Sequence, residues 1–211
     1  MQKKLLIIAL VLPTLALVAS SYIINKDKSV KVGKKAPMMD VKMEGIDGNE
    51  YALSELAGEN GLLVVFSCNT CPFVVGSDKF EGWEKQYNDL AAKAAEGKIG
   101  FVLINSNEGK REGADSKIAM MKHAEEMGYT MNYVVDADSK LADAFGAKTT
   151  PHLFAIDGKG KVAFTGSIDN SWDSARTEPE TYALDVIAHL ADGKILKEKT
   201  SSPRGCSIKR K

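Results

Sequence analysis

The sequence has little cysteine, few aromatic residues and no excess of charge of either sign. Three cysteines among 211 residues are too few to hold a fold together, which excludes a small disulfide-rich scaffold. Lys and Arg together number 28, as do Asp and Glu, so no basic field is available for a nucleic-acid partner. The hydrophobic content of 44% is ordinary for a globular protein and excludes a disordered or collagen-like chain. We therefore expect any disulfide in this protein to serve chemistry.

The N-terminus has the pattern of an export signal. Lys3 and Lys4 precede an apolar run over residues 5–19, and residues 18–20 offer a small-residue cleavage site. We therefore predict a signal peptide over residues 1–20. The alternative is an uncleaved membrane anchor that ends near residue 24, because residues 22–24 lengthen the apolar segment. Both versions export the protein, to the periplasm, to the outer face of the membrane or out of the cell.

Composition divides the rest of the chain into three parts. Residues 21–35 are polar and rich in lysine, and we expect them to form a linker. Residues 36–193 form the predicted domain, which is long enough to bury one core. Residues 194–211 are predicted to be a flexible basic tail that carries Cys206.

Strand patterns alternate with helix patterns inside the domain. Two wholly apolar runs, Leu62–Phe66 and Ile99–Ile104, are typical of strands that are buried on both faces. Residues 41–53 predict an N-terminal hairpin, and residues 153–164 predict a second antiparallel pair. The predicted helices are residues 73–95, a segment capped by Asp115 or Ser116, residues 140–145 and the segment before Gly193. This alternation predicts an α/β fold, with a central mixed sheet flanked by helices.

A pair of cysteines, Cys68 and Cys71, follows the first apolar strand and precedes a helix. Unpaired backbone N–H groups and the positive end of the helix dipole favour a thiolate at such a position. We predict that Cys68 is the attacking thiolate and that Cys71 resolves its mixed disulfide. Pro72 fits the helix N-terminus, where its missing N–H costs nothing. A zinc site needs two further ligands, and a structural disulfide closing so short a loop stabilises little, so a redox dithiol is favoured.

Several segments, in this order, resemble the thioredoxin-fold redoxins, in particular the alkyl hydroperoxide reductase/thiol-specific antioxidant family. They are Ala36-Pro37 with Asp47-Gly48 and Leu53-Ser54-Glu55-Leu56, the run from Val64 to Phe73, the run from Phe145 to Pro151, and Asp157-Gly158-Lys159-Gly160 with Gly166. The dithiol segment and the end of the chain, residues 205–209, are similar to the peroxiredoxin-like group with a Cys-Asn-x-Cys-Pro-Phe-Val pattern. The resemblance covers residues 36–191 and implies a thioredoxin-like fold with an N-terminal hairpin extension.

The resemblance also implies a substrate-binding element at Thr150 and Pro151. In thioredoxin-like folds a proline after a cis peptide bond lies beside the dithiol, and the residue before it pairs with an extended substrate. The sequence departs from the family in two places. Residues 62–66 hold no ionisable side chain where thioredoxins have a buried carboxylate, so the proton-transfer partner is unassigned. Peroxiredoxins have a threonine three residues before the peroxidatic cysteine, whereas Val65 stands three residues before Cys68.

Cys206 and His152 each leave alternatives open. Three roles are open for Cys206. It is either a third redox thiol that folds back and resolves a disulfide at Cys68 or Cys71, a cysteine that pairs with another molecule, or a residue without a redox role. His152 follows Pro151 and is the histidine placed near the dithiol. It either tunes the thiolate, binds a metal, or is an ordinary strand residue, which we favour.

Three functions are consistent with these residues. We favour an exported thiol–disulfide oxidoreductase that needs no cofactor or metal and acts on protein or small-molecule thiols and disulfides with an unidentified electron donor. The second is a peroxiredoxin-like thiol peroxidase, in which Cys68 or Cys71 is oxidised to sulfenate. The third is a Cu(I) carrier, in which the two cysteines bind the metal with help from His152 or Cys206.

Overall fold

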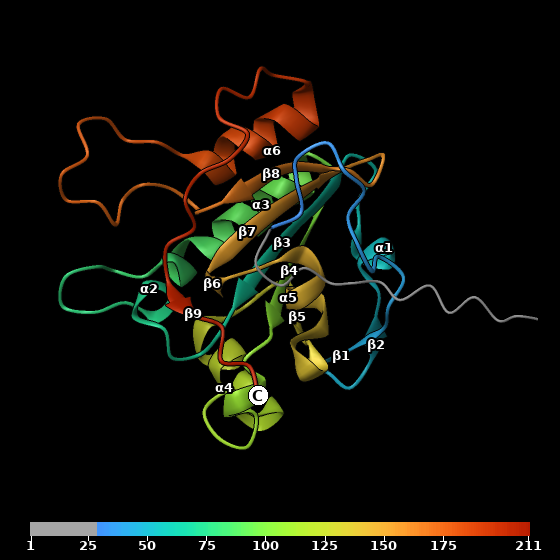
Figure 1. Ribbon diagram of the computed structural model, residues 1–211, viewed down its shortest axis with the longest axis vertical. Coiled ribbons are helices and arrows are strands. Elements are labelled where there is room, and N and C mark those ends of the chain that lie inside the picture. The colour runs from blue at the N-terminus through green and yellow to red at the C-terminus, as the bar shows by residue number, and fades with distance from the viewer. Residues whose placement is uncertain (1–28) are drawn as a thin grey trace, which may run out of the picture.

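Seven strands form one mixed sheet at the centre of the molecule (Figure 1). The computed structural model describes residues 29–211, so the predicted signal peptide or anchor lies outside the described residues. The strands are β1 (Met43–Gly45), β2 (Glu50–Tyr51), β3 (Gly61–Ser67), β4 (Ile99–Asn105), β5 (Asn132–Val135), β7 (His152–Asp157) and β8 (Val162–Gly166), in the order β2-β1-β5-β4-β3-β7-β8. Strand β4 is parallel to β3 and β5, and the other neighbours are antiparallel.

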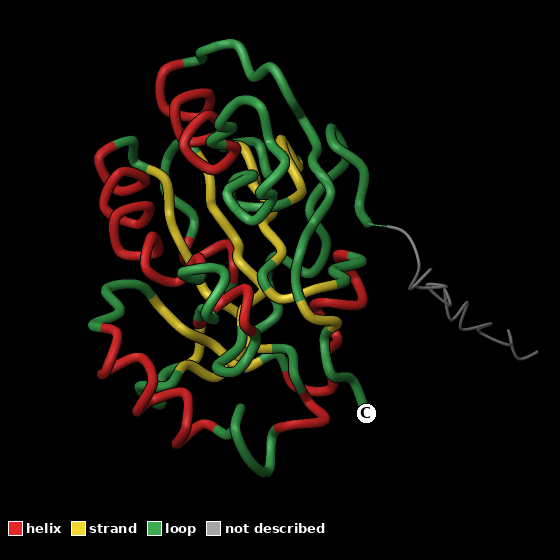
Figure 2. Tube along the Cα trace, turned by 90° about the vertical axis from the view of Figure 1, so that its left-hand side faces the viewer, coloured by secondary structure: helices red, strands yellow, loops and turns green. Residues whose placement is uncertain are grey.

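Helices cover both faces of this sheet (Figures 1 and 2). Helices α3 (Tyr87–Glu96), α4 (Lys117–Met127) and α6 (Tyr182–Asp192) pack on one face, and α1 (Leu53–Leu56) and α5 (Lys140–Phe145) pack on the other. The chain also forms α2 (Pro72–Val75) and three short 3-10 helices, η1 (Trp83–Gln86), η2 (Glu108–Lys110) and η3 (Ala137–Ser139). Within residues 29–211, none of the helices has the length and apolar character needed to cross a bilayer.

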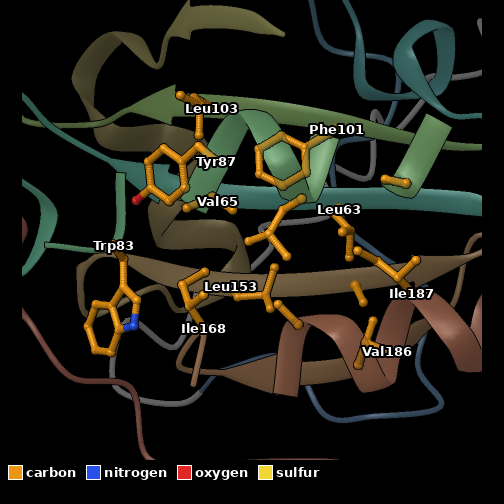
Figure 3. Close-up of a cluster of buried hydrophobic side chains, with 14 of the residues drawn as sticks. Leu63, Val65, Trp83, Tyr87, Phe101, Leu103, Leu153, Ile168, Val186 and Ile187 are labelled. Atoms are coloured by element: carbon orange, nitrogen blue, oxygen red, sulfur yellow. The ribbon is translucent and has the colours of Figure 1, made fainter. Parts of the chain in front are cut away.

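Strand β3 shows why a wholly apolar run becomes the central strand. All of its residues are buried, and successive side chains point to opposite faces of the sheet. Leu63 and Val65 enter the core under α3 and α6, which Figure 3 shows, whereas Val64 and Phe66 enter the core under α1 and α5. Because both faces are covered by helices, neither set of side chains is polar.

The predicted α/β class and thioredoxin-like arrangement are confirmed, including the N-terminal hairpin β1–β2. The predicted continuous helix over residues 73–95 is wrong in its first half. The chain instead forms α2, an irregular segment, η1 and α3. Gly76 and Gly82 break the helix, because both have positive φ angles, 97° and 83°, that a right-handed helix does not accept.

The ends of the domain are packed more closely than the sequence predicts. In the predicted linker, Val30 donates a backbone hydrogen bond to Phe145 and Gly33 donates one to Val162, so residues 29–35 lie against the domain. The prediction of a flexible tail is wrong at its end. There, Cys206–Ser207 forms strand β9, Ile208 is buried, and Arg210 bonds to Asp143 at 2.7 Å. Strand pairing, a buried apolar side chain and the ion pairs of Arg210 with Asp143 and Lys211 with Glu108 hold this basic segment in place.

Phe154→Ala should be strongly destabilising. Phe154 packs edge-to-face on Phe66 and Phe145, with ring centroids 5.7 and 5.1 Å apart, and all three rings are fully buried. Removing it leaves a cavity, so the free energy of unfolding should fall by about 3–5 kcal/mol in urea denaturation. Ile195→Ala is the matched control, because Ile195 is 93% exposed and should lose less than about 0.5 kcal/mol. Equal losses in the two variants would contradict this account of the core.

Candidate active site

The dithiol lies where the buried strand β3 ends. Cys68 follows the last residue of the strand, and Cys71 is the N-cap of α2 with Pro72 as its first helical residue. Both cysteines are only 2% exposed and belong to the core under α3 and α6. The strand therefore fixes Cys68, and the start of the helix fixes Cys71.

A small second sheet brings two distant segments to the sulfur atoms. Strand β6 (Thr149–Thr150) pairs antiparallel with β9 (Cys206–Ser207), with Thr150 opposite Cys206. The peptide bond between Thr150 and Pro151 is cis, as the resemblance implies. The predicted substrate-binding element and the predicted third thiol thus meet at the dithiol.

Thr150 contacts both sulfur atoms. Its Oγ1 lies 3.1 Å from the Sγ of Cys68, and its carbonyl oxygen lies 2.9 Å from the Sγ of Cys71 and accepts the thiol proton. The backbone N–H of Cys206 donates to the Sγ of Cys71 at 3.2 Å. Cys71 is therefore approached by one backbone acceptor and one backbone donor, and its protonation decides which of them is satisfied.

The two thiols of the pair have opposite pKa shifts. A hydrogen bond from Cys68 lowers the pKa of Cys71 to about 5, with Cys206 acting in the same direction and burial against it. The same shared hydrogen bond, together with burial, raises the pKa of Cys68. Burial raises the pKa of Cys206 to about 11. The Thr150 carbonyl, by contrast, accepts a hydrogen bond from Cys71 only when that thiol is protonated.

The predicted position of the thiolate changes accordingly. The sequence predicts that the helix begins near Pro72 and that Cys68 is the thiolate favoured there; the helix does begin at Pro72, but its N-cap is Cys71. A thiolate is stabilised by unpaired N–H groups at that position. The N-cap position and the direction of its pKa shift support Cys71 as the thiolate and Cys68 as the thiol that donates to it, and we propose this assignment in place of the predicted one.

Asp115 is a site residue that the sequence does not reveal. It is fully buried and accepts three hydrogen bonds, from the backbone N–H of Asn69 at 2.9 Å and from the side chains of Asn105 and Asn107 at 2.8 and 3.0 Å. Its negative charge contributes to the raised pKa of Cys68. The sequence offers Asp115 only as an alternative to Ser116 as a helix cap; Ser116 is the cap, so the Asp115 side chain turns inward.

His152 is a strand residue with both ring nitrogens engaged. Its Nδ1 accepts the backbone N–H of Lys148 at 3.2 Å, and its Nε2 lies 3.1 Å from the Thr165 hydroxyl. Burial lowers the pKa of His152 to about 3, so the ring is neutral. It stacks on Phe154 in the core under α1 and α5, on the other side of the sheet from the dithiol. In the part of the chain described here, no group of three or more His, Cys, Asp and Glu side chains is arranged to hold a metal ion.

The arrangement of a central strand, a CxxC turn and a cis-proline agrees with a family match over residues 31–184, to the family described as Redoxin. The chain belongs to the redoxin family. This confirms the resemblance to the thioredoxin-fold redoxins.

One relative and two solved structures illustrate how this redoxin compares with known proteins. It is 24% identical over 165 residues to the thiol-disulfide oxidoreductase ResA of Geobacillus thermodenitrificans, covering 75% of this chain and 82% of that protein. It is 31% identical to an uncharacterized conserved protein from Geobacillus kaustophilus, with a TM-score of 0.74 and coverage of 86% and 93%. Peroxidoxin BcpB from Mycobacterium tuberculosis shares the fold at 20% identity, with a TM-score of 0.55 and coverage of 79% and 99%.

The pH dependence of thiol alkylation should report the low pKa of Cys71. In the reduced protein, the rate of alkylation by iodoacetamide should rise as the pH passes about 5 and then level off, because only the thiolate reacts. Cys68→Ala removes the principal hydrogen bond to Cys71, so the inflection should move up toward the ordinary thiol value of about 8.5. Rates are normalised to their plateau, and the alkylated residue is located by mass spectrometry. An inflection that stays near 5 in the variant, or first alkylation at Cys68, would contradict the assignment.

Asp115→Asn should loosen the turn that carries the dithiol. The amide has one acceptor oxygen in place of two and turns an N–H₂ group toward donors, so at least one buried group loses its partner. The free energy of unfolding should fall by about 1–3 kcal/mol in urea denaturation. Asp138→Asn, at an exposed carboxylate that bonds to Lys140 on the surface, is the control and should cost little. If both variants are as stable as the wild type, the buried network does not support the site.

Proposed function

We propose that this redoxin is an exported thiol–disulfide oxidoreductase that works through the Cys68–Cys71 dithiol. The observation that carries the proposal is the placement of two buried cysteines at the start of α2, with Thr150 in contact with both sulfur atoms. The relative ResA is named as a thiol-disulfide oxidoreductase, which supports the same class of enzyme. The basic and apolar N-terminus supports export, to the periplasm or the outer face of the membrane.

The reaction proceeds in two exchange steps. The Cys71 thiolate attacks one sulfur of a client disulfide, forming a mixed disulfide and releasing the other client sulfur as a thiolate. The Cys68 thiol then gives its proton to the client thiolate released in the first step and attacks the Sγ of Cys71, which forms the Cys68–Cys71 disulfide and releases the second client thiolate. The client gains two electrons and the dithiol loses two. Run in reverse, the same steps oxidise a client dithiol, and the external electron donor or acceptor sets the direction.

Thr150, Pro151 and Pro72 have positioning roles in this scheme. Thr150 contacts both sulfurs, and its backbone lies on the short sheet beside them. Pro151 fixes the direction of the chain after Thr150, and Pro72 starts the helix at the cysteine that carries the thiolate. Cys206 is the second sulfur available to resolve a mixed disulfide at Cys71, because its N–H already lies 3.2 Å from that sulfur.

Cys71→Ser should abolish exchange, whereas Cys68→Ser should stop it halfway. Without Cys71 there is no thiolate to attack. Without Cys68 the mixed disulfide at Cys71 should accumulate and be trapped with a disulfide-containing protein such as insulin, seen by non-reducing electrophoresis and mass spectrometry. Cys206→Ser separates the roles of the two resolving sulfurs, because loss of turnover in that variant alone assigns resolution to the tail.

The proposal fails if wild-type protein neither reduces nor oxidises a client disulfide at a rate above that of free cysteine. A rapid reaction of the reduced protein with hydrogen peroxide, without disulfide exchange, would instead support the thiol peroxidase. Retention of Cu(I) against a chelator by the reduced protein, again without exchange, would support the carrier.

A further inference from the structure

The C-terminal strand lies where a client of the dithiol has to bind. Strand β9 occupies the backbone edge of Thr149–Thr150, and its Cys206 stands opposite Thr150. The N–H of Cys206 fills the donor position at the Cys71 sulfur. With the tail in place both cysteines of the dithiol are only 2% exposed, too little for an incoming disulfide to reach their sulfur atoms. Exchange requires direct contact between sulfurs, so this arrangement has to open before the protein can act.

The tail is held by contacts on both sides of Cys206. Before it, the Arg204 N–H donates to the Ser167 hydroxyl at 3.1 Å. After it, the Ile208 N–H donates to the carbonyl of Lys148 at 3.1 Å, and the Ile208 side chain is buried under α5. The Lys209 N–H donates to the Asn107 side-chain oxygen at 2.8 Å, and the Lys209 carbonyl accepts the N–H of Gly109 at 2.6 Å. These anchors are all outside the dithiol, so they can be weakened without altering a sulfur or its direct partners.

We propose that β9 is a substrate-mimicking cover, which an extended cysteine-containing segment of a client polypeptide displaces. The tail is itself such a segment, with a cysteine placed opposite Thr150 and a backbone that adds a strand to an open edge. A peptide can replace every main-chain contact that the tail gives up, whereas a small thiol cannot. The inference rests on the proposed function and adds a client class and a means of protection to it.

Gly205 gives a way to displace the strand without substituting a cysteine. A Cβ at this position would lie 2.1 Å from the Thr150 carbonyl oxygen, so Gly205→Ala cannot keep the pairing. Gly48→Ala is the matched control: Gly48 also has a φ that side chains disfavour, +87°, but a Cβ there meets nothing within 4 Å. Ile208→Ser, which weakens the buried anchor, is the second variant and decides the matter if Gly205→Ala does not fold.

The test measures how fast iodoacetamide alkylates Cys68 and Cys71 in the reduced full-length protein. Rates are compared at the high-pH plateau, so that a change in pKa does not enter, and sites are located by mass spectrometry. Gly205→Ala and Ile208→Ser should raise the rate by about tenfold or more, the factor expected for one or two lost backbone hydrogen bonds, and Gly48→Ala should not. Circular dichroism checks that each variant is folded. Wild-type rates in both folded tail variants would overturn the proposal.

The client class is tested with a peptide of residues 203–211 in which Ser replaces Cys206. Added to Gly205→Ala, this peptide should slow alkylation again, because it can pair with the vacated edge without forming a disulfide. S-methylglutathione is the small-molecule control and should have no effect. Equal protection by both, or none by the peptide, would overturn the polypeptide client. Alkylation requires no exchange, so these results are independent of whether the proposed oxidoreductase activity is found.

Discussion

The complete burial of strand β3 is the constraint on which the site depends. The strand lies between β4 and β7, and helices cover the sheet above and below it. A strand held on every side ends at a fixed point, so Cys68 has a defined position. From there, the two intervening residues and the start of α2 determine where Cys71 lies. The packed core therefore fixes the positions of both sulfur atoms at the end of the strand.

Burial by itself would make both thiols poor nucleophiles, because a charged sulfur is costly away from water. The site offsets this cost at one sulfur only. Cys71 receives the hydrogen bond of Cys68 and the N–H of Cys206, and its pKa falls, whereas the pKa of Cys68 rises. One of these donors belongs to β9, more than a hundred residues away in the sequence. The tail therefore both covers the thiolate and stabilises it.

Local pattern predicted most of the fold, and long-range contacts account for what it missed. The apolar run Leu62–Phe66 predicts a buried strand because its burial follows from its own composition. No such signal exists for β9, whose two residues become a strand only by pairing with Thr149–Thr150. The same holds for Asp115, whose inward position depends on three donors that come from two other segments. Gly76 can end a helix, but the apolar spacing around it is helical, so local pattern alone predicts one continuous helix there.

Asp115 also answers the question raised by the apolar β3, which carries no carboxylate beside the dithiol. A carboxylate does reach the site, but from the segment before α4, and both of its oxygens already accept hydrogen bonds. An acceptor so fully engaged is poorly suited to take the Cys68 proton. Its charge instead keeps that proton on Cys68, and its bond to the Asn69 N–H holds the turn between the two cysteines. Asp115 is therefore a positioning residue, and resolution by Cys68 has to begin when the Cys71 thiolate has been consumed in the mixed disulfide.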